Sequence, residues 1–315
     1  MPEIKKPRRG SLAYYPRVRA SRIYPTVTTL PKTDALKPLV FAGYKAGCAH
    51  AIVVDTRKGS PTFGKEISVP VTVLDCPPLK AIGIRAYKNT RQGLQPLTEF
   101  WIKDLPKDLS RKVKAKGSKE ENLKKMDEAD DIRLIVCTQP RLSAFGKKKP
   151  EVFEVGLGGK TAKEKVEFAK GMLGKEVKAT DVLKEGEYVD VVAVTKGKGT
   201  AGPVERFGVK IQPRHAKQKR RHVGSLGQER PGKVRPTVPM AGQLGFGRRT
   251  ELNKRLLKIG EGLQPPGGIK RYGLIKGTYL ILEGSVPGSK KRLVMLRPAL
   301  RAKGIAPSEV KQLVI

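Results

Sequence analysis

The sequence has 315 residues, 38% of them hydrophobic and 5% aromatic, and its 65 Lys and Arg against 29 Asp and Glu give a formal net charge of +36. This length allows one large domain or two medium ones, and the low aromatic content argues against base-stacking platforms as the main binding device. A free protein with this charge would repel itself, so a polyanionic partner is expected; nucleic acid is the natural candidate because phosphate contacts release counterions. An anionic membrane is the alternative, but we find no lipid anchor and no membrane-binding helix.

No apolar run reaches the 18 residues that a transmembrane helix needs, and Met1 to Arg9 lack the apolar segment of a secretory signal. Cys48, Cys76 and Cys137 are widely spaced and form no CxxC pair. We therefore expect three reduced cysteines in a cytoplasmic protein.

The chain begins with a basic segment that is expected to form an N-terminal extension, residues 1–38. Its first 22 residues hold seven Lys or Arg, one acid and three prolines, with no hydrophobic periodicity. This composition predicts an extended arm rather than a folded element. A plain disordered tail is the alternative, and the charge favours an arm buried among RNA phosphates.

From Leu39 onward, short apolar runs rich in β-branched residues alternate with Gly, Pro and Asp. Their spacing predicts a barrel or a sandwich rather than alternating βαβ units. Residues 104–130 interrupt the strands with mixed charge and many acids, which should face away from RNA. Residues 160–173 carry apolar side chains at helical spacing and predict one amphipathic helix, and 188–195 predict another strand.

A long basic stretch follows, with fifteen Lys or Arg and two acids between Arg206 and Lys258. Within it, residues 213–239 have no apolar periodicity and cannot bury a core, so only an external partner can offset their ordering entropy. The predicted organisation is a basic N-terminal extension (1–38), a β-rich core (39–212 and 241–304) with an α/β insertion (about 89–190), a basic central loop (213–240) and a C-terminal tail (305–315).

Two glycine-rich loops imitate nucleotide-binding motifs. Gly156 to Thr161 follows a predicted strand and precedes a helix, but Glu154 occupies the position at which a phosphate-binding loop needs its first glycine. Gly197 to Gly202 fits GxGxxG, but Pro203 and a basic stretch follow it instead of the expected helix and acidic residue. A tight turn that grips RNA backbone explains the second loop better than a dinucleotide site.

Catalytic and metal chemistry find no support. His215 and His222 lie in a cationic loop that disfavours a metal cation, and convergent ligands for a metal are missing. We therefore predict no cofactor, no metal and no catalytic residue, and we expect these histidines to contact RNA or solvent. The single tryptophan, Trp101, is expected to have a packing role.

Four segments carry a resemblance to a known family. They are PRRGSLAYYPR (7–17), FAGYKAGCAHAIVVD (41–55), VTKGKGTAGPVERF (194–207) and MAGQLGFGRRTELNKRLLKIG (240–260). In this order they resemble the ribosomal protein L3 family of the large subunit, most closely its archaeal type, and the likeness covers nearly the whole chain.

The resemblance implies a mainly β fold with a six-stranded translation-factor-like β-barrel, an α/β insertion and long basic extensions. It implies a structural constituent of the large subunit, not an enzyme, that binds 23S-type ribosomal RNA near its 3′ end and nucleates subunit assembly. It also implies a basic loop reaching toward the peptidyl-transferase centre, neighbouring large-subunit proteins as partners, no small-molecule substrate, and a cytoplasmic location in the ribosome.

The family's TKGKG turn matches at 195–199, so Lys196 and Lys198 are assigned to RNA. The loop tip departs from the archaeal pattern: Glu229 stands where archaeal and eukaryotic members carry tryptophan, and Gln228 matches the glutamine of the bacterial form. The predicted RNA-binding residues are Arg8, Arg9, Arg17, Arg19, Lys196, Lys198, Arg206, Arg214, His215, Lys217, Lys219, Arg220, Arg221, Gln228, Arg230, Lys233, Arg235, Gln243, Arg248 and Arg249.

Two other function classes compete with this interpretation. An RNA-modifying enzyme would need a cofactor loop or an acid–base pair beside the basic stretch, and both glycine loops fail as cofactor loops. A nucleic-acid-packaging protein that binds duplex DNA usually reads its shape with helices or wedges, whereas an irregular basic loop suits crevices in folded RNA.

Overall fold

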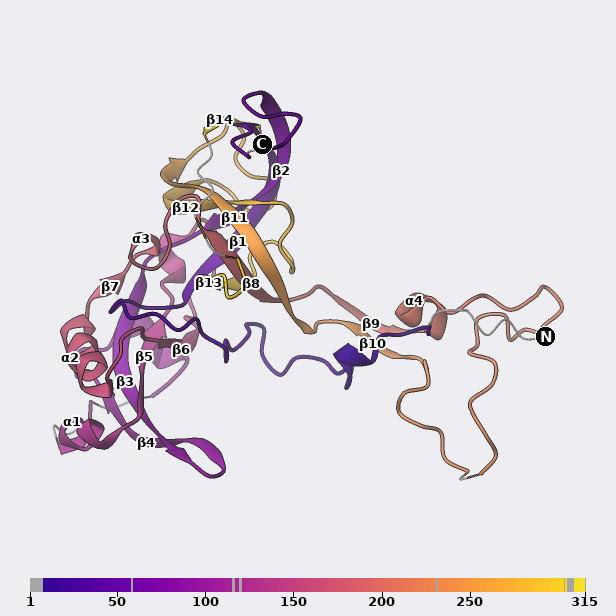
Figure 1. Cartoon of the computed structure of the whole chain (residues 1–315), viewed down its shortest axis with the longest axis horizontal. Coiled ribbons are helices and arrows are strands. Elements are labelled where there is room, and N and C mark those ends of the chain that lie inside the picture. The colour runs from indigo at the N-terminus through magenta and orange to yellow at the C-terminus, as the bar shows by residue number, and fades with distance from the viewer. Residues whose placement is uncertain are drawn as a thin grey trace. The chain divides into compact units, whose positions relative to one another are not determined.

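A computed structural model describes residues 8–57, 59–114, 117–118, 121–230, 232–302, 304 and 309–314. The chain divides into two compact units: unit 1 is Met1–Ile23 with Val194–Arg249, and unit 2 is Tyr24–Ala193 with Thr250–Ile315. Their elements can be followed in Figure 1. Residues 1–7 of the expected extension, and residues 305–308 and 315 of the expected tail, lie outside the described residues.

The fold is mainly β, as the sequence predicts. The helices are α1 (Glu121–Lys124), α2 (Ala162–Met172), α3 (Ala179–Val182) and α4 (Pro203–Phe207), with 3-10 turns at Leu12–Tyr14, Lys107–Arg111, Lys125–Glu128 and Pro140–Leu142. The strands are β1 (Phe41–Val54), β2 (Glu66–Asp75), β3 (Leu79–Thr90), β4 (Gly93–Trp101), β5 (Asp131–Cys137), β6 (Val152–Gly156), β7 (Glu176–Val177), β8 (Tyr188–Val194), β9 (Gly197–Ala201), β10 (Gly242–Gly245), β11 (Arg248–Leu263), β12 (Ile275–Glu283), β13 (Leu293–Pro298) and β14 (Val310–Val314).

Unit 2 contains a seven-stranded sheet in the order β13-β8-β11-β12-β2-β1-β14, in which β13 pairs with β1 as well as with β8. The β-branched runs that predicted strands supply its apolar face, and Phe41, Leu74, Leu280 and Leu296 are fully buried there. Residues 310–314, expected in a tail, instead form β14, which pairs with β1.

The second sheet of unit 2 has the order β4-β3-β5-β6, with β7 paired to β3. The first strand of this sheet along the chain is β3, which starts at Leu79, earlier than the boundary of about 89 expected for the insertion. The predicted helix is α2, where the Thr161 hydroxyl accepts a hydrogen bond from the Glu164 amide and caps the first turn. Val166 and Ala169 are the buried side chains of α2, which packs against β5 and β3.

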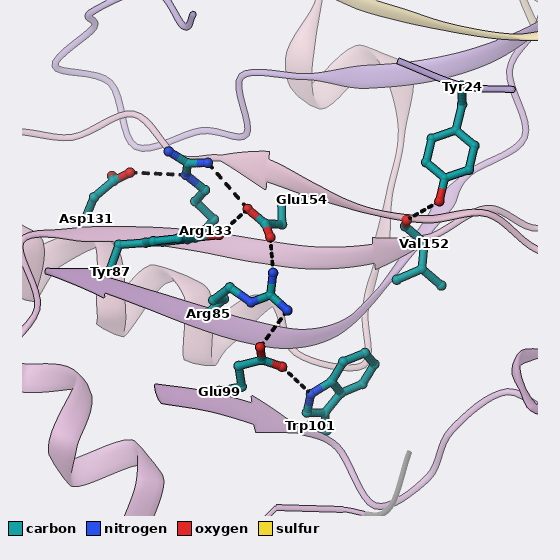
Figure 2. A network of polar contacts seen from close by, with 9 residues as sticks. All are labelled: Tyr24, Arg85, Tyr87, Glu99, Trp101, Asp131, Arg133, Val152 and Glu154. Atoms are coloured by element: carbon teal, nitrogen blue, oxygen red, sulfur yellow. Dashed lines mark hydrogen bonds and ion pairs between the residues drawn. The ribbon is translucent and has the colours of Figure 1, made fainter. Parts of the chain in front are cut away.

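A chain of ion pairs crosses the face of this second sheet (Figure 2). Glu154 on β6 pairs with Arg85 on β3 and with Arg133 on β5, and Arg85 also pairs with Glu99 on β4. The same Glu99 accepts a hydrogen bond from the indole nitrogen of Trp101 at 3.1 Å, which gives this half-buried ring a fixed place. These acids therefore neutralise cations of their own sheet.

The expected N-terminal extension, residues 1–38, is divided between the two units. Residues 24–38 belong to unit 2, where the Tyr24 hydroxyl donates to the Val152 carbonyl at 3.0 Å (Figure 2). The preceding residues belong to unit 1, together with 194–212 and 241–249, which we had expected in the β core. The reason is pairing: the TKGKG turn forms β9, which pairs with β10 rather than with the large sheet.

Candidate RNA interface

The centre of unit 1 is a short antiparallel ribbon of β9 and β10, with the N-terminal arm beside it. Gly242 lies opposite Ala201 and Gly245 opposite Gly197, and the amide of Ala20 in the arm donates to the carbonyl of Phe246 at 2.8 Å. Gly245 has φ of +69°, and a side chain there would place its Cβ 2.1 Å from the backbone oxygen of Lys196, the residue just before β9. The ribbon thus needs glycine at this position of the recognised motif.

Arg206, one of the predicted RNA-binding residues, makes several hydrogen bonds within unit 1. Its guanidinium donates to three backbone carbonyls: those of Gln243 at 2.9 Å, Met240 at 2.9 Å and Arg17 at 3.3 Å. Gln243 lies in β10, Met240 lies two residues before this strand, and Arg17 lies in the arm. These bonds use three of the five N–H donors of the guanidinium and join the arm to the segment at β10.

An aromatic cluster that the sequence does not predict supports the same junction. The rings of Tyr15 and Phe207 stack at 6.3 Å, and the Arg17 guanidinium lies 4.5 Å from the centre of the Phe207 ring. Gly10 approaches so closely that a Cβ at this position would lie 2.5 Å from the Phe207 ring. The only signal in the sequence is the Tyr-Tyr pair inside a basic arm.

A groove of about 430 Å³ lies between the arm and β10. On its wall the guanidinium of Arg249 covers the Tyr14 ring at 4.4 Å, and Tyr14 is 51% exposed. Arg19 and Arg248 line the groove as well, and both are exposed. The structure thus brings Arg19 of the arm close to Arg248 and Arg249, which are more than 200 residues away in the sequence.

From Gly208 to Ala241, the described residues form no helix or strand, only turns and extended chain (Figure 1). Lys217 and Gln218 have left-handed backbone conformations, φ of +40° and +64°, which are unusual for residues with side chains and place a tight turn in the middle of the basic run. The predicted loop residues are all exposed: Arg214, His215, Lys217, Lys219, Arg220, Arg221, Gln228, Arg230, Lys233 and Arg235.

The remaining predicted residues divide between exposed and internally bonded side chains. Arg9, Lys196 and Lys198 are exposed, and Lys198 lies 3.9 Å from Glu205. Arg8 donates to the Thr237 carbonyl at 2.8 Å and so joins the arm to the loop. The Gln243 amide donates to carbonyl oxygens of its own strand, so its contacts are structural.

Charge is distributed very unevenly. From Arg8 to Ile23 and from Val194 to Arg249 the sequence holds nineteen Lys or Arg but only two acids, Glu205 and Glu229. Cations this dense repel one another, and bound phosphates would remove that repulsion. The surface is therefore chemically matched to a polyanion.

The other glycine loop serves the chain itself. The amides of Gly158 and Gly159 donate to the carbonyls of Lys37 and Thr33 at 2.9 and 3.0 Å, and a Cβ at Gly158 would lie 2.2 Å from the Ala35 oxygen. These glycines admit the segment 33–37 rather than a phosphate. Among the residues that the structure describes, no cluster of His, Cys, Asp or Glu could hold a metal, and no helix is long and apolar enough to span a membrane.

A sequence model of ribosomal protein L3 matches residues 1–311. The chain belongs to the ribosomal protein L3 family. Archaeal relatives named large ribosomal subunit protein uL3 agree over nearly their full length: 48% identity for Methanosphaera stadtmanae, covering 94% of this chain and 92% of the relative, and 48% for Methanothermobacter thermautotrophicus, covering 95% and 93%. The relative from Nanoarchaeum equitans is 46% identical, covering 94% and 91%. The predicted family is thus confirmed, and the family is one of structural, non-enzymatic ribosomal proteins.

Proposed function

We propose that this chain is a structural constituent of the large ribosomal subunit in the cytoplasm and that unit 1 binds large-subunit ribosomal RNA. The observation that carries the proposal is the excess of exposed cations on unit 1, many of them on the loop 213–240, which forms no helix or strand in its described residues. Family membership and the archaeal uL3 relatives agree with it. The protein has no catalytic role.

The finer role is that of a primary rRNA binder. In this proposal the protein binds 23S-type RNA near its 3′ end, nucleates subunit assembly and extends the loop 213–240 toward the peptidyl-transferase centre. The exposed loop residues named above would contact phosphates, with Arg9, Arg19, Lys196 and Lys198 beside them. Neighbouring large-subunit proteins are its other partners.

Unit 2 would provide the anchor. We propose that β13, β8, β11, β12, β2 and β1 form the six-stranded translation-factor-like barrel. The pairing of β13 with both β8 and β1 supports this, because it joins the two ends of that series of strands. A closed sheet has no free edges, which stabilises a rigid body from which extensions can project.

The test is a titration of the full-length protein against large-subunit rRNA at increasing KCl, with duplex DNA as competitor. For eight phosphate contacts, the slope of log K against log salt is expected to be about −6, between about −0.7 and −0.9 per phosphate. The protein should also sediment with purified large subunits. A salt-independent affinity, or equal competition by duplex DNA, would refute the proposal and favour an enzyme or a DNA-packaging protein.

A further inference from the structure

We propose that the groove between the arm and β10 holds one unpaired nucleotide of the RNA, with its base stacked on Tyr14. This inference rests on the proposed function, since it assumes that unit 1 lies against ribosomal RNA. It goes further by naming the ligand of one site as a single-stranded nucleotide rather than a length of duplex backbone.

The Tyr14 side chain lies in the wall of the groove. Arg249 covers the ring with its guanidinium at 4.4 Å, yet half of Tyr14 remains exposed. The exposed part of the ring is available to a partner. A nucleobase is a flat π system of matching shape, and a cation beneath the ring strengthens a stack of this kind.

The size and lining of the groove suit a nucleotide. Its volume of about 430 Å³ falls within the range of about 300–1,000 Å³ typical of small-ligand sites. Gly245 and Gly247 form part of its wall, and the absence of side chains there lets a sugar-phosphate approach the backbone closely.

The groove also carries positive charge. Arg19 and Arg248 line the same groove, and Arg19 also lines the adjoining hollow beside Gly197 and Gly199. Planar guanidinium groups suit phosphate oxygens, so these two arginines can bind the phosphates on either side of the stacked base.

The experiment compares wild type with Tyr14→Phe and Tyr14→Leu in rRNA binding across a range of KCl concentrations. Loss of one base stack should weaken binding of the Leu variant by about 5- to 150-fold at every salt concentration, from about 1–3 kcal/mol. The salt slope should not change, because no charge is removed. The Phe variant should bind like wild type. Leu12→Ala is the matched control, since Leu12 is exposed on the same turn but does not line the groove.

Ultraviolet crosslinking of the wild-type complex supplies the second readout. Tyr14 should crosslink to one nucleotide, and that nucleotide should be unpaired in the rRNA. The inference fails if Tyr14→Leu binds within twofold of wild type, if its salt slope falls by about one unit, or if the crosslink maps to a duplex. Failure of the proposed function looks different, since the wild-type protein itself would then show no preference for rRNA.

Discussion

The Nε atom of Arg206 donates a hydrogen bond to the backbone oxygen of Gln243 at 2.9 Å. The same side chain reaches the Met240 and Arg17 carbonyls, so one arginine joins three backbone segments. We therefore expect Arg206→Ala and Arg206→Lys both to weaken rRNA binding by at least about tenfold, because hydrogen bonds from charged groups contribute about 1.5 kcal/mol or more each. A lysine keeps the charge but cannot span three acceptors.

Hydrogen exchange provides the structural readout for this prediction. The Ala20 amide, bonded to Phe246 in wild type, should exchange faster in both variants. Lys210→Ala is the control, because Lys210 is exposed and close in sequence. If Arg206→Lys bound RNA as tightly as wild type and kept the Ala20 amide protected, Arg206 would be a phosphate contact rather than a positioning residue.

The hydrogen bonds of Arg206 could not be predicted from the sequence. A basic residue in a basic stretch looks like every other phosphate ligand, and only the fold reveals that three of its donors bond to backbone carbonyls. The exposure of the loop cations could be predicted from composition, because a basic segment without a core cannot bury them. The Tyr14–Arg249 pair could not be found in that way, since it depends on the arm returning to a strand more than 200 residues further along the chain.

For the fold, too, local features could be predicted from the sequence, whereas long-range strand pairings could not. Runs of β-branched residues predicted the strands, and helical spacing predicted α2, because both signals are local. The β9–β10 ribbon was assigned to the core, since a short Gly-Lys strand carries no information about its pairing partner. The start of the second sheet at Leu79 could not be predicted for a related reason: β2 and β3 are both apolar strands separated by only three residues, although they belong to different sheets.

The cations of the central loop should determine how strongly binding depends on salt. Replacement of Lys217, Lys219, Arg220 and Arg221 by alanine should reduce the magnitude of the salt slope by about three units, since each phosphate contact contributes about 0.7–0.9. The measurement is filter binding to rRNA between low and moderate KCl. The loop has no core to disrupt, so the unfolding transition of the variant should match that of wild type.

A charge-matched control separates loop contacts from net charge. Lys163, Lys170, Lys175 and Lys184 are exposed on unit 2, and replacing them by alanine removes the same four charges. Their loss should leave the slope nearly unchanged. Equal reductions in both quadruple variants would mean that rRNA responds only to total charge, which contradicts a contact role for the loop.

The buried pair of Asp190 and Arg297 should be a strong determinant of unit 2 stability. Their side chains are 0% and 7% exposed, with Nη2 of Arg297 at 3.1 Å from Oδ2 of Asp190. The carboxylate also accepts the Asn253 amide at 3.0 Å, which links β8, β11 and β13. Asp190→Ala leaves a buried guanidinium unpaired, so the free energy of unfolding should fall by about 3–5 kcal/mol in urea titrations.

An exposed pair gives the comparison. Lys311 on β14 pairs with Glu66 on β2, with 46% and 53% of the two side chains exposed. Lys311→Ala should change the free energy of unfolding by no more than about 1 kcal/mol, because solvent screens such pairs. Similar losses for Asp190→Ala and Lys311→Ala would contradict the importance assigned to the buried pair.

The three cysteines should differ sharply in reactivity. Cys48 is exposed, whereas Cys76 and Cys137 are buried. Burial raises the pKa of the Cys137 thiol to about 11 and that of Cys76 well above its usual value. The thiolate is the reacting form, so at pH 8 only about one Cys137 thiol in a thousand is reactive even before burial hinders access.

Iodoacetamide at pH 8 should therefore label Cys48 first, and mass spectrometry of the digested protein can follow each site. Raising the pH toward 11 increases the thiolate fraction of Cys137 about tenfold per unit, but labelling should remain slow until the sheet opens. In urea all three should react at similar rates, as the burial that separates them is lost. Labelling of Cys137 as fast as Cys48 in the folded protein would show that the second sheet of unit 2 opens far more readily than its fully buried packing implies.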